Sequence, residues 1–199
     1  TAKITVCAEE GTNYEAAEAS FILKVEKAEN IINAADINRN FSKKAQKVKL
    51  GVTVQDGAAL SYSSNNKSVK VNGNGQITIA KKFVGRAVIS ISAGETSRYK
   101  ATFSQITITV KPSGVKISKA SNSAKGKATV FWKKNANADG YLIQYSTDKK
   151  FKSGVKTVTV KKVKTVKTTL KKLKKGKTYY IRICTYKGYG NARVTSSWS

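Results

Sequence analysis

The sequence predicts an all-β chain made of consecutive antiparallel β-sandwiches. The composition is 40% hydrophobic with a single proline, and Thr, Val and Ile are plentiful, which favours pleated strands over helices. Short runs of alternating apolar and polar residues are separated by turn sequences, the pattern of a sandwich with short strands. A segment at the start of the chain also recurs further along it, which indicates a repeated module. At 199 residues there is room for two small domains, each with its own core.

The repeat appears when residues 2–25 are moved by 85 positions, because they then align with residues 87–110 without a gap. The apolar alternation keeps its phase across the two copies. Seven positions are identical: Ala2/Ala87, Ile4/Ile89, Ala8/Ala93, Glu10/Glu95, Tyr14/Tyr99, Ala16/Ala101 and Val25/Val110. Residues 1–29 are therefore expected to be the last part of a preceding repeat. Two strands alone are marginally stable, so this part should pack on something, fray, or pair with a neighbouring molecule by strand addition.

Residues 30–112 read as strands throughout. The runs are VKLGVTV (48–54), LSYSS (60–64), SVKVN (68–72), QITIA (76–80) and AVISISA (87–93), separated by QDG, SSNNK and NGNG. The sequence NGNG, residues 72–75, supplies residues that tolerate positive φ and so predicts a tight hairpin. A phosphate-cradling loop is the alternative, but it needs a following helix, and no helical pattern follows.

The stretch from Leu60 to Ala93 resembles the bacterial Ig-like, group 2 family. The positions that carry the resemblance are an aromatic residue, the "SSN" turn, two short strands and a glycine-led strand: Tyr62, Ser63 to Asn65, Val69, Val71, Gly75, Ile77 and Gly85 to Ala93. The resemblance is specific over these residues and looser over residues 30–112. It implies an Ig-like β-sandwich.

After a linker at KPSG (111–114), residues 113–199 resemble a fibronectin type III domain. The resemblance rests on KATVFWKK, DGYLIQYS, LKKGKTYYIRICTY and SSWS. It implies an inward-facing core made of Trp132, Tyr141, Ile143, Leu173, Tyr179, Ile181 and Ile183. Tyr179 would direct its hydroxyl at the backbone as a tyrosine corner. The family pattern has one more strand after SSWS, so this module is expected to lack its last strand.

The stretch from 155 to 177 fits two structures. Val163, Val166, Leu170 and Leu173 recur at helical spacing. Val and Thr dominate residues 155–170, however, and they lose rotamer freedom in a helix. As strands, residues 158–160 and 166–170 alternate cleanly, and the fibronectin-like framework requires strands here, with Val166, Leu170, Leu173 and Tyr179 in the core.

Positive charge is concentrated in this second half. The chain carries +27 overall, of which residues 113–199 contribute +20 from 22 basic and two acidic residues. A surface for an anionic partner is predicted at Lys161, Lys162, Lys164, Lys167, Lys171, Lys172, Lys174 and Lys175. Solubilising charge and protection of strand edges are the simpler roles for the same lysines. A wall polymer, a host glycan or a host protein is the favoured partner. Nucleic acid is disfavoured because no groove-entering element is visible, although Tyr180, Tyr186 and Tyr189 are candidate stacking platforms.

The residue types needed for catalysis are sparse. The chain has no histidine, which removes the commonest general base and metal ligand. Cys7 and Cys184 lie far apart, and Cys184, two positions after an outward Arg182, should lie on an outer face. No metal site, cofactor or enzymatic activity is expected, and no apolar run reaches the ~18 residues of a membrane span.

Together, the two resemblances imply a piece of a secreted or cell-surface protein of a Gram-positive bacterium, located outside the cell, on its surface or in its wall. Such modules serve as spacers, structural units and adhesive units. The alternative is a dedicated binding module for an anionic polysaccharide or a host protein such as an immunoglobulin. A weaker alternative is an accessory region of a wall-active or glycan-active enzyme.

Overall fold

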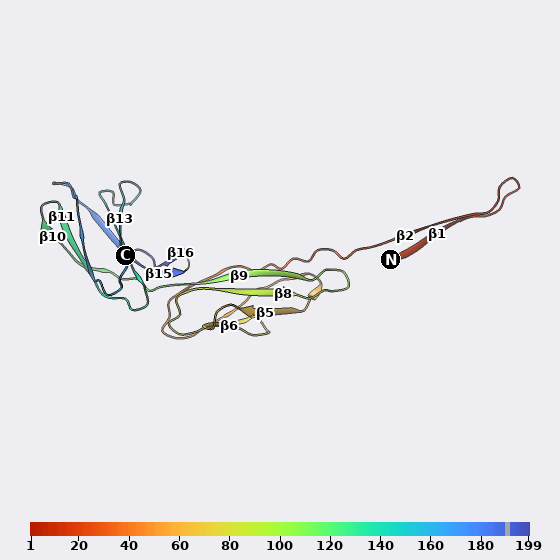
Figure 1. The fold of residues 1–199 in the computed structure, drawn as a ribbon, viewed down its shortest axis with the longest axis horizontal. Coiled ribbons are helices and arrows are strands. Elements are labelled where there is room, and N and C mark those ends of the chain that lie inside the picture. The colour runs from red at the N-terminus through yellow and green to blue at the C-terminus, as the bar shows by residue number, and fades with distance from the viewer. Residues whose placement is uncertain (190–191) are drawn as a thin grey trace.

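The computed structural model describes residues 1–189 and 192–199, and nearly all regular structure in them is β-strand. Figure 1 shows a hairpin at one end, a first sandwich in the middle and a second sandwich at the other end. The only helical element among the described residues is one 3-10 turn, η1 (Gln55–Gly57). The described residues include no helix of the length and apolar character needed to cross a bilayer. The prediction of an all-β chain of β-sandwiches is confirmed.

The hairpin consists of β1 (Ala2–Ala8) and β2 (Ala17–Leu23), which pair antiparallel. Every residue of both strands is exposed. Figure 1 shows the hairpin projecting away from the first sandwich on an extended segment.

The first sandwich has two sheets. One sheet has the order β3-β9-β8-β5, from β3 (Ile37–Asn40), β9 (Thr102–Lys111), β8 (Gly85–Ala93) and β5 (Leu60–Ser64). The other has the order β4-β7-β6, from β4 (Gln46–Lys49), β7 (Gln76–Ile79) and β6 (Val69–Val71). All pairs are antiparallel except β3 with β9, which run parallel.

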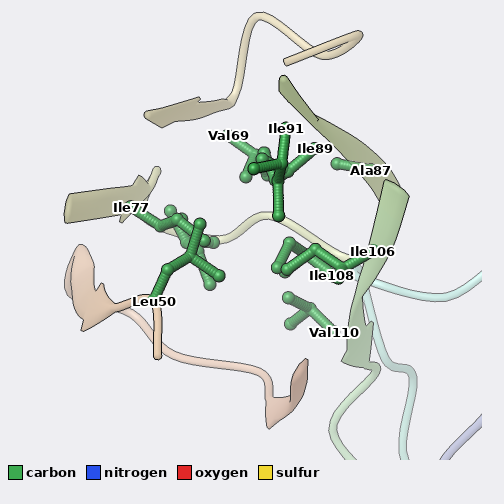
Figure 2. Packing of buried hydrophobic residues seen from close by; sticks show 10 residues of the cluster. Leu50, Val69, Ile77, Ala87, Ile89, Ile91, Ile106, Ile108 and Val110 are labelled. Atoms are coloured by element: carbon green, nitrogen blue, oxygen red, sulfur yellow. The ribbon is translucent and has the colours of Figure 1, made fainter. Parts of the chain in front are cut away.

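The core of this sandwich follows from the alternation in its strands. Along β8 buried and more exposed residues alternate almost perfectly, because successive side chains point to opposite faces. Figure 2 shows the buried residues from both sheets packed together: Leu50, Val69, Ile77, Ile79, Ala87, Ile89, Ile91, Ile106, Ile108 and Val110. Burying each of the larger side chains contributes about 1.5–3 kcal/mol.

The NGNG hairpin joins β6 to β7 as predicted. Gly75 has φ +69°, and its N–H donates to the Asn72 carbonyl at 2.9 Å. The Asn72 side-chain oxygen accepts from the backbone N–H of Asn74 at 3.1 Å and of Gln76 at 2.9 Å. By contrast, the run at 48–54 is not one strand, because β4 ends at Lys49 and Leu50 turns into the core.

The second sandwich also has two sheets. One has the order β10-β11-β14, from β10 (Ile117–Ala124), β11 (Lys127–Trp132) and β14 (Lys167–Leu170). The other has the order β13-β12-β15-β16, from β13 (Lys156–Val160), β12 (Gly140–Ser146), β15 (Tyr180–Tyr189) and β16 (Ala192–Thr195). The stretch from 155 to 177, which fitted either a helix or strands, therefore contains the strands β13 and β14 and the loops next to them.

The predicted core residues of this sandwich fall into two groups. Trp132, Tyr141, Ile143 and Ile183 are buried in one cluster, and Leu173, Tyr179 and Ile181 pack against it partly buried. The Tyr179 hydroxyl accepts a hydrogen bond from the Lys174 backbone N–H at 3.1 Å, which is the contact of a tyrosine corner. The prediction for Val166 is wrong, because its side chain is 37% exposed just before β14 begins.

Two further features of this module concern the end of the chain and Cys184. A short strand, β16, pairs with β15 from Tyr186↔Thr195 to Tyr189↔Ala192. It lies before SSWS in the sequence and has four residues, so the strand expected after SSWS is a different one. Cys184 is not part of the core cluster, but it is fully buried.

Candidate functional site

The eight predicted lysines lie on two loops and one strand of the second sandwich. Lys161, Lys162 and Lys164 lie between β13 and β14, Lys167 begins β14, and the other four lie between β14 and β15. All eight are exposed. None of the ion pairs found among the described residues involves them. They are exposed and make no ion pair within the described part of the chain, so they are free to attract an anion.

Lys174 and Lys175 line a groove at one end of the second sandwich, which has a volume of about 750 Å³. Three further lysines line the same groove: Lys125, Lys127 and Lys177. The other six predicted lysines do not line it. We call these five residues, Lys125, Lys127, Lys174, Lys175 and Lys177, the lysine groove.

Two matching turns create the lysine groove. Gly126, between β10 and β11, has φ +68°, and Gly176, between β14 and β15, has φ +71°. The two turns are tied together, since the Leu173 N–H donates to the Gly126 carbonyl at 3.0 Å. Each glycine stands between two lysines in the sequence, as Lys-Gly-Lys. This repeated tripeptide is the signal that would have identified the additional lysines.

The walls of the lysine groove are partly apolar. Leu170, Leu173, Tyr179 and Ile181 contribute to its lining, so the cationic groups stand at the rim of an apolar cleft. Lysine ammonium groups act as mobile point charges and not as planar forks, so they favour a polyanion with repeated charges over one rigid ligand. The groove can therefore attract anionic polymer by charge and contact its nonpolar parts.

The two carboxylates of this sandwich do not neutralise the lysine groove. Asp139 forms an ion pair with Lys187 at 2.7 Å, and accepts the Gly188 N–H at 2.9 Å. Burial alone would raise the pKa of Asp139, but these two contacts outweigh it and lower the pKa. Asp148 accepts the backbone N–H groups of its own loop, led by Lys150 and Lys152, which lowers its pKa.

Aromatic side chains form a stack on the outer face of β15. The Arg182 guanidinium lies 4.2 Å from the Phe151 ring centroid and 4.7 Å from the Trp198 ring centroid. Both its Nε and Nη2 donate to the Gln144 side-chain oxygen, at 2.8 and 2.6 Å. The stack covers this face, and burial raises the pKa of the Cys184 thiol to about 11.

The three tyrosines considered as base-stacking platforms do not form a row. Tyr186 is buried, and the Arg193 guanidinium lies 4.6 Å from its ring centroid. Tyr180 and Tyr189 are exposed, but they lie at the two ends of β15. Successive bases could not stack on them as on one platform.

A second cavity, of about 800 Å³, lies where the two sandwiches meet. It is lined by Phe41 and Lys43 from the first sandwich and by residues 113–118 and 133–137 from the second. Four lysines contribute to its lining, Lys43, Lys116, Lys133 and Lys134. The linker between the two sandwiches forms one side of this cavity, through Ser113 and Gly114.

The linker is held by buried polar side chains of the second sandwich. The Ser113 carbonyl accepts from Asn135 Nδ2 at 2.6 Å and from Thr185 Oγ1 at 2.8 Å. Asn135 Nδ2 also donates to Ser113 Oγ at 2.9 Å. Asn135, Thr185 and Pro112 are buried. The sequence predicts a linker at KPSG, and these contacts fix it to the second sandwich. We call Ser113, Asn135 and Thr185 the linker clamp.

Comparison with known proteins supports part of the sequence-based interpretation. Residues 110–199 match the family model of the fibronectin type III domain. No curated protein sequence matches the chain. The fibronectin type III prediction for this half is confirmed, and domains of this family are commonly structural or binding modules, typically without catalytic activity.

The chain is also similar to several solved structures, all at low sequence identity. The FN1–FN3 domains of chicken CNTN1 are 14% identical, with 98% of this chain and 76% of that chain covered and a TM-score of 0.37. A two-domain fibronectin type III segment from chicken tenascin is 20% identical, with 83% and 95% covered and a TM-score of 0.40. Domains A168–A170 of titin are 13% identical, with 99% and 73% covered and a TM-score of 0.33.

Proposed function

We propose that this chain, whose residues 110–199 match the fibronectin type III family, is a non-enzymatic spacer or adhesion segment of a secreted or cell-surface protein of a Gram-positive bacterium. Its modules are the last part of an Ig-like repeat (1–29), a complete Ig-like sandwich (30–112) and the fibronectin type III sandwich (113–199). The Ig-like assignment rests on the group 2 pattern around Tyr62 and Gly85.

The observation that carries the spacer proposal is the linker clamp. A spacer must hold what it carries at a defined distance, so its module junctions need to resist bending. Here β9 leads directly into Pro112, and the next residue, Ser113, accepts three hydrogen bonds from buried side chains. The first sandwich also approaches the second at Gly85, next to the Tyr189 ring. These contacts favour one fixed junction over a flexible tether.

Backbone ¹⁵N relaxation of residues 30–199 tests this proposal, because it gives the rotational correlation time of each sandwich separately. The two sandwiches are expected to tumble together, with one correlation time. The control is a chain with the four residues Gly-Ser-Gly-Ser inserted between Pro112 and Ser113. In this chain the two sandwiches should have different correlation times. Separate tumbling in the unmodified chain would overturn the spacer proposal.

The lysine groove supports a second function, binding of an anionic wall polymer or host glycan. Five lysines meet there at an apolar cleft without a neighbouring carboxylate partner among the described residues. Poly(glycerol phosphate), which has the chemistry of a wall polymer, is a suitable probe. The double variant Lys175→Glu, Lys177→Glu is expected to weaken binding at least about 10-fold, because it reverses two charges in the groove.

A matched control variant distinguishes binding by the lysine groove from attraction by the overall positive charge. Lys161→Glu, Lys162→Glu changes the net charge by the same amount outside the groove and should weaken binding less than about 3-fold. Binding through the groove should also persist in part at 0.5 M salt, where the Debye length is about 4 Å. Equal losses for both double variants would assign the binding to net charge alone and refute a specific site.

A further inference from the structure

The hairpin β1–β2 has one wholly apolar face. Paired residues of an antiparallel hairpin point to the same side, so the pairs alternate between two faces. One face carries Ala2, Ile4, Val6, Ala8, Ala17, Ala19, Phe21 and Leu23. The opposite face is mainly polar: Lys3, Thr5, Cys7, Glu18, Ser20 and Ile22. Such an amphipathic hairpin needs something to cover its apolar face.

The pairing register of this hairpin reproduces that of β8–β9 at the repeat offset of 85 residues. Ile4 pairs with Phe21, and Ile89 pairs with Ile106. The ends of the two hairpins agree as well, with Ala8↔Ala17 in one and Ala93↔Thr102 in the other. A shared register means that the same side chains face the same side in both copies.

The loops of the two hairpins also correspond. The Gly11 N–H donates to the Tyr14 carbonyl at 3.0 Å, and the Thr96 N–H donates to the Tyr99 carbonyl at 2.9 Å. These positions are again 85 residues apart. The likeness found in the sequence is therefore a likeness of backbone geometry from strand to loop to strand.

The surroundings of the two hairpins differ completely. Val6 is 60% exposed, whereas its counterpart Ile91 is fully buried. Phe21 is 55% exposed, whereas its counterpart Ile106 is 2% exposed. In the complete sandwich the sheet β4-β7-β6 covers this face, and its Val69 and Ile77 pack in the same core cluster (Figure 2). The outer edges of β8 and β9 are paired with β5 and β3.

We propose that the apolar face of β1–β2 docks the complementary half of an Ig-like sandwich, a segment similar to residues 30–84 that precedes β1 in the same polypeptide. This inference rests on the proposed division of the chain into repeats. The spacer role by itself does not involve the apolar face of β1–β2. The segment would supply an edge strand for each side of the hairpin and a three-stranded sheet over its apolar face.

Two features favour an occupant in the same polypeptide over a second copy of the chain. In the complete sandwich β8 follows β7 after only residues 80–84, so the covering sheet leads directly into the hairpin. A second copy could cover the apolar face with its own hairpin, but the outer edges of all strands would stay unpaired, which is unfavourable. The half-sandwich covers the face and also pairs both edges.

Amide hydrogen exchange tests the proposal on two proteins. One is the chain of residues 1–199, and the other is the encoded chain extended by the ~60 residues before Thr1, the length that the 85-residue repeat requires. In the longer protein, exchange at Val6 and Phe21 should slow at least about 100-fold, because the hairpin becomes part of a cooperative core. Val6→Asp should abolish this protection, whereas Thr5→Asp, on the opposite face, should leave it within about 3-fold.

Three results would overturn the proposal. The first is unchanged exchange at Val6 and Phe21 in the longer protein. The second is protection that Thr5→Asp removes as completely as Val6→Asp does. The third is a concentration-dependent dimer of the longer protein that Val6→Asp dissociates, since this would assign the face to a second copy. None of these results bears on the junction at Ser113, so the spacer proposal is tested separately.

Discussion

Replacing Asn135 with alanine should weaken the second sandwich and its junction together. Asn135 is 7% exposed, and its side chain makes three hydrogen bonds. Nδ2 donates to both Ser113 oxygens at 2.6 and 2.9 Å, and Oδ1 accepts the Asn137 N–H at 2.9 Å. Each bond contributes about 1 kcal/mol, so the free energy of unfolding should fall by about 2–4 kcal/mol. For a module of this size, the melting temperature should fall by about 10–20 °C.

Tryptophan fluorescence is a selective probe for this experiment. Both tryptophans of the chain, Trp132 and Trp198, lie in the second sandwich, so urea unfolding followed by their emission reports that module alone. The control is Asn137→Ala, which keeps the backbone N–H that bonds to Asn135. It should change the free energy of unfolding by less than about 0.5 kcal/mol.

A specific outcome would refute the reasoning about the linker clamp. If the free energy of unfolding of Asn135→Ala lies within about 0.5 kcal/mol of that of the unmodified chain, water replaces the three hydrogen bonds fully and they do not stabilise the module. If Asn135→Ala and Asn137→Ala lower the free energy of unfolding equally, the loss comes from changing the loop in general. The hydrogen bonds to Ser113 would then not be its cause. Correlation times of the two sandwiches in Asn135→Ala should separate, since the linker is released.

Three further predictions concern the second sandwich. Tyr141→Phe should cost about 1–3 kcal/mol in urea unfolding, because the buried hydroxyl accepts the Asn135 N–H at 2.9 Å and donates to the Val163 carbonyl at 3.0 Å. Gly140→Ala should cost at least about 2 kcal/mol by the same assay, since the added Cβ would collide with the Val160 carbonyl oxygen of the paired strand. At pH 8, iodoacetamide should modify one thiol in the folded chain, that of exposed Cys7, and two after unfolding, because burial raises the pKa of Cys184 to about 11. The folded thiol holds its proton more tightly than the unfolded one, so the stability that Cys184 contributes is complete below about pH 9 and is lost as the pH rises to about 11.

Local patterns predicted the parts of the fold that depend on alternation and turn chemistry. The hairpin at Asn72 to Gly75 and the corner at Tyr179 follow from residues that suit those geometries, and both form as expected. The 85-residue repeat predicted two corresponding strand pairs, and the structure gives them the same register.

Contacts between distant segments account for what the sequence did not reveal. Alternation places Cys184 on an outer face correctly, but only the tertiary structure shows Trp198 lying over Arg182 on that face. The strand at Ala192–Thr195 is too short to be recognised without its partner β15. In the same way, Lys125 and Lys174 are far apart in sequence, and only the hydrogen bond between their turns brings them to one groove.

The parallel pairing of β3 with β9 determines how the first sandwich would respond to mechanical tension. β3 lies near the entry of the chain and β9 leads to the exit, with Ile37↔Ile108 and Asn40↔Lys111 in register. A pull on the two flanking segments would therefore drive these neighbouring strands in opposite directions along their common axis. Their hydrogen bonds, and that from the Phe41 N–H to the Lys111 carbonyl, would be sheared together and not peeled apart one at a time. In the proposed role as a spacer, this arrangement would help the sandwich to stay folded when its two ends are pulled apart.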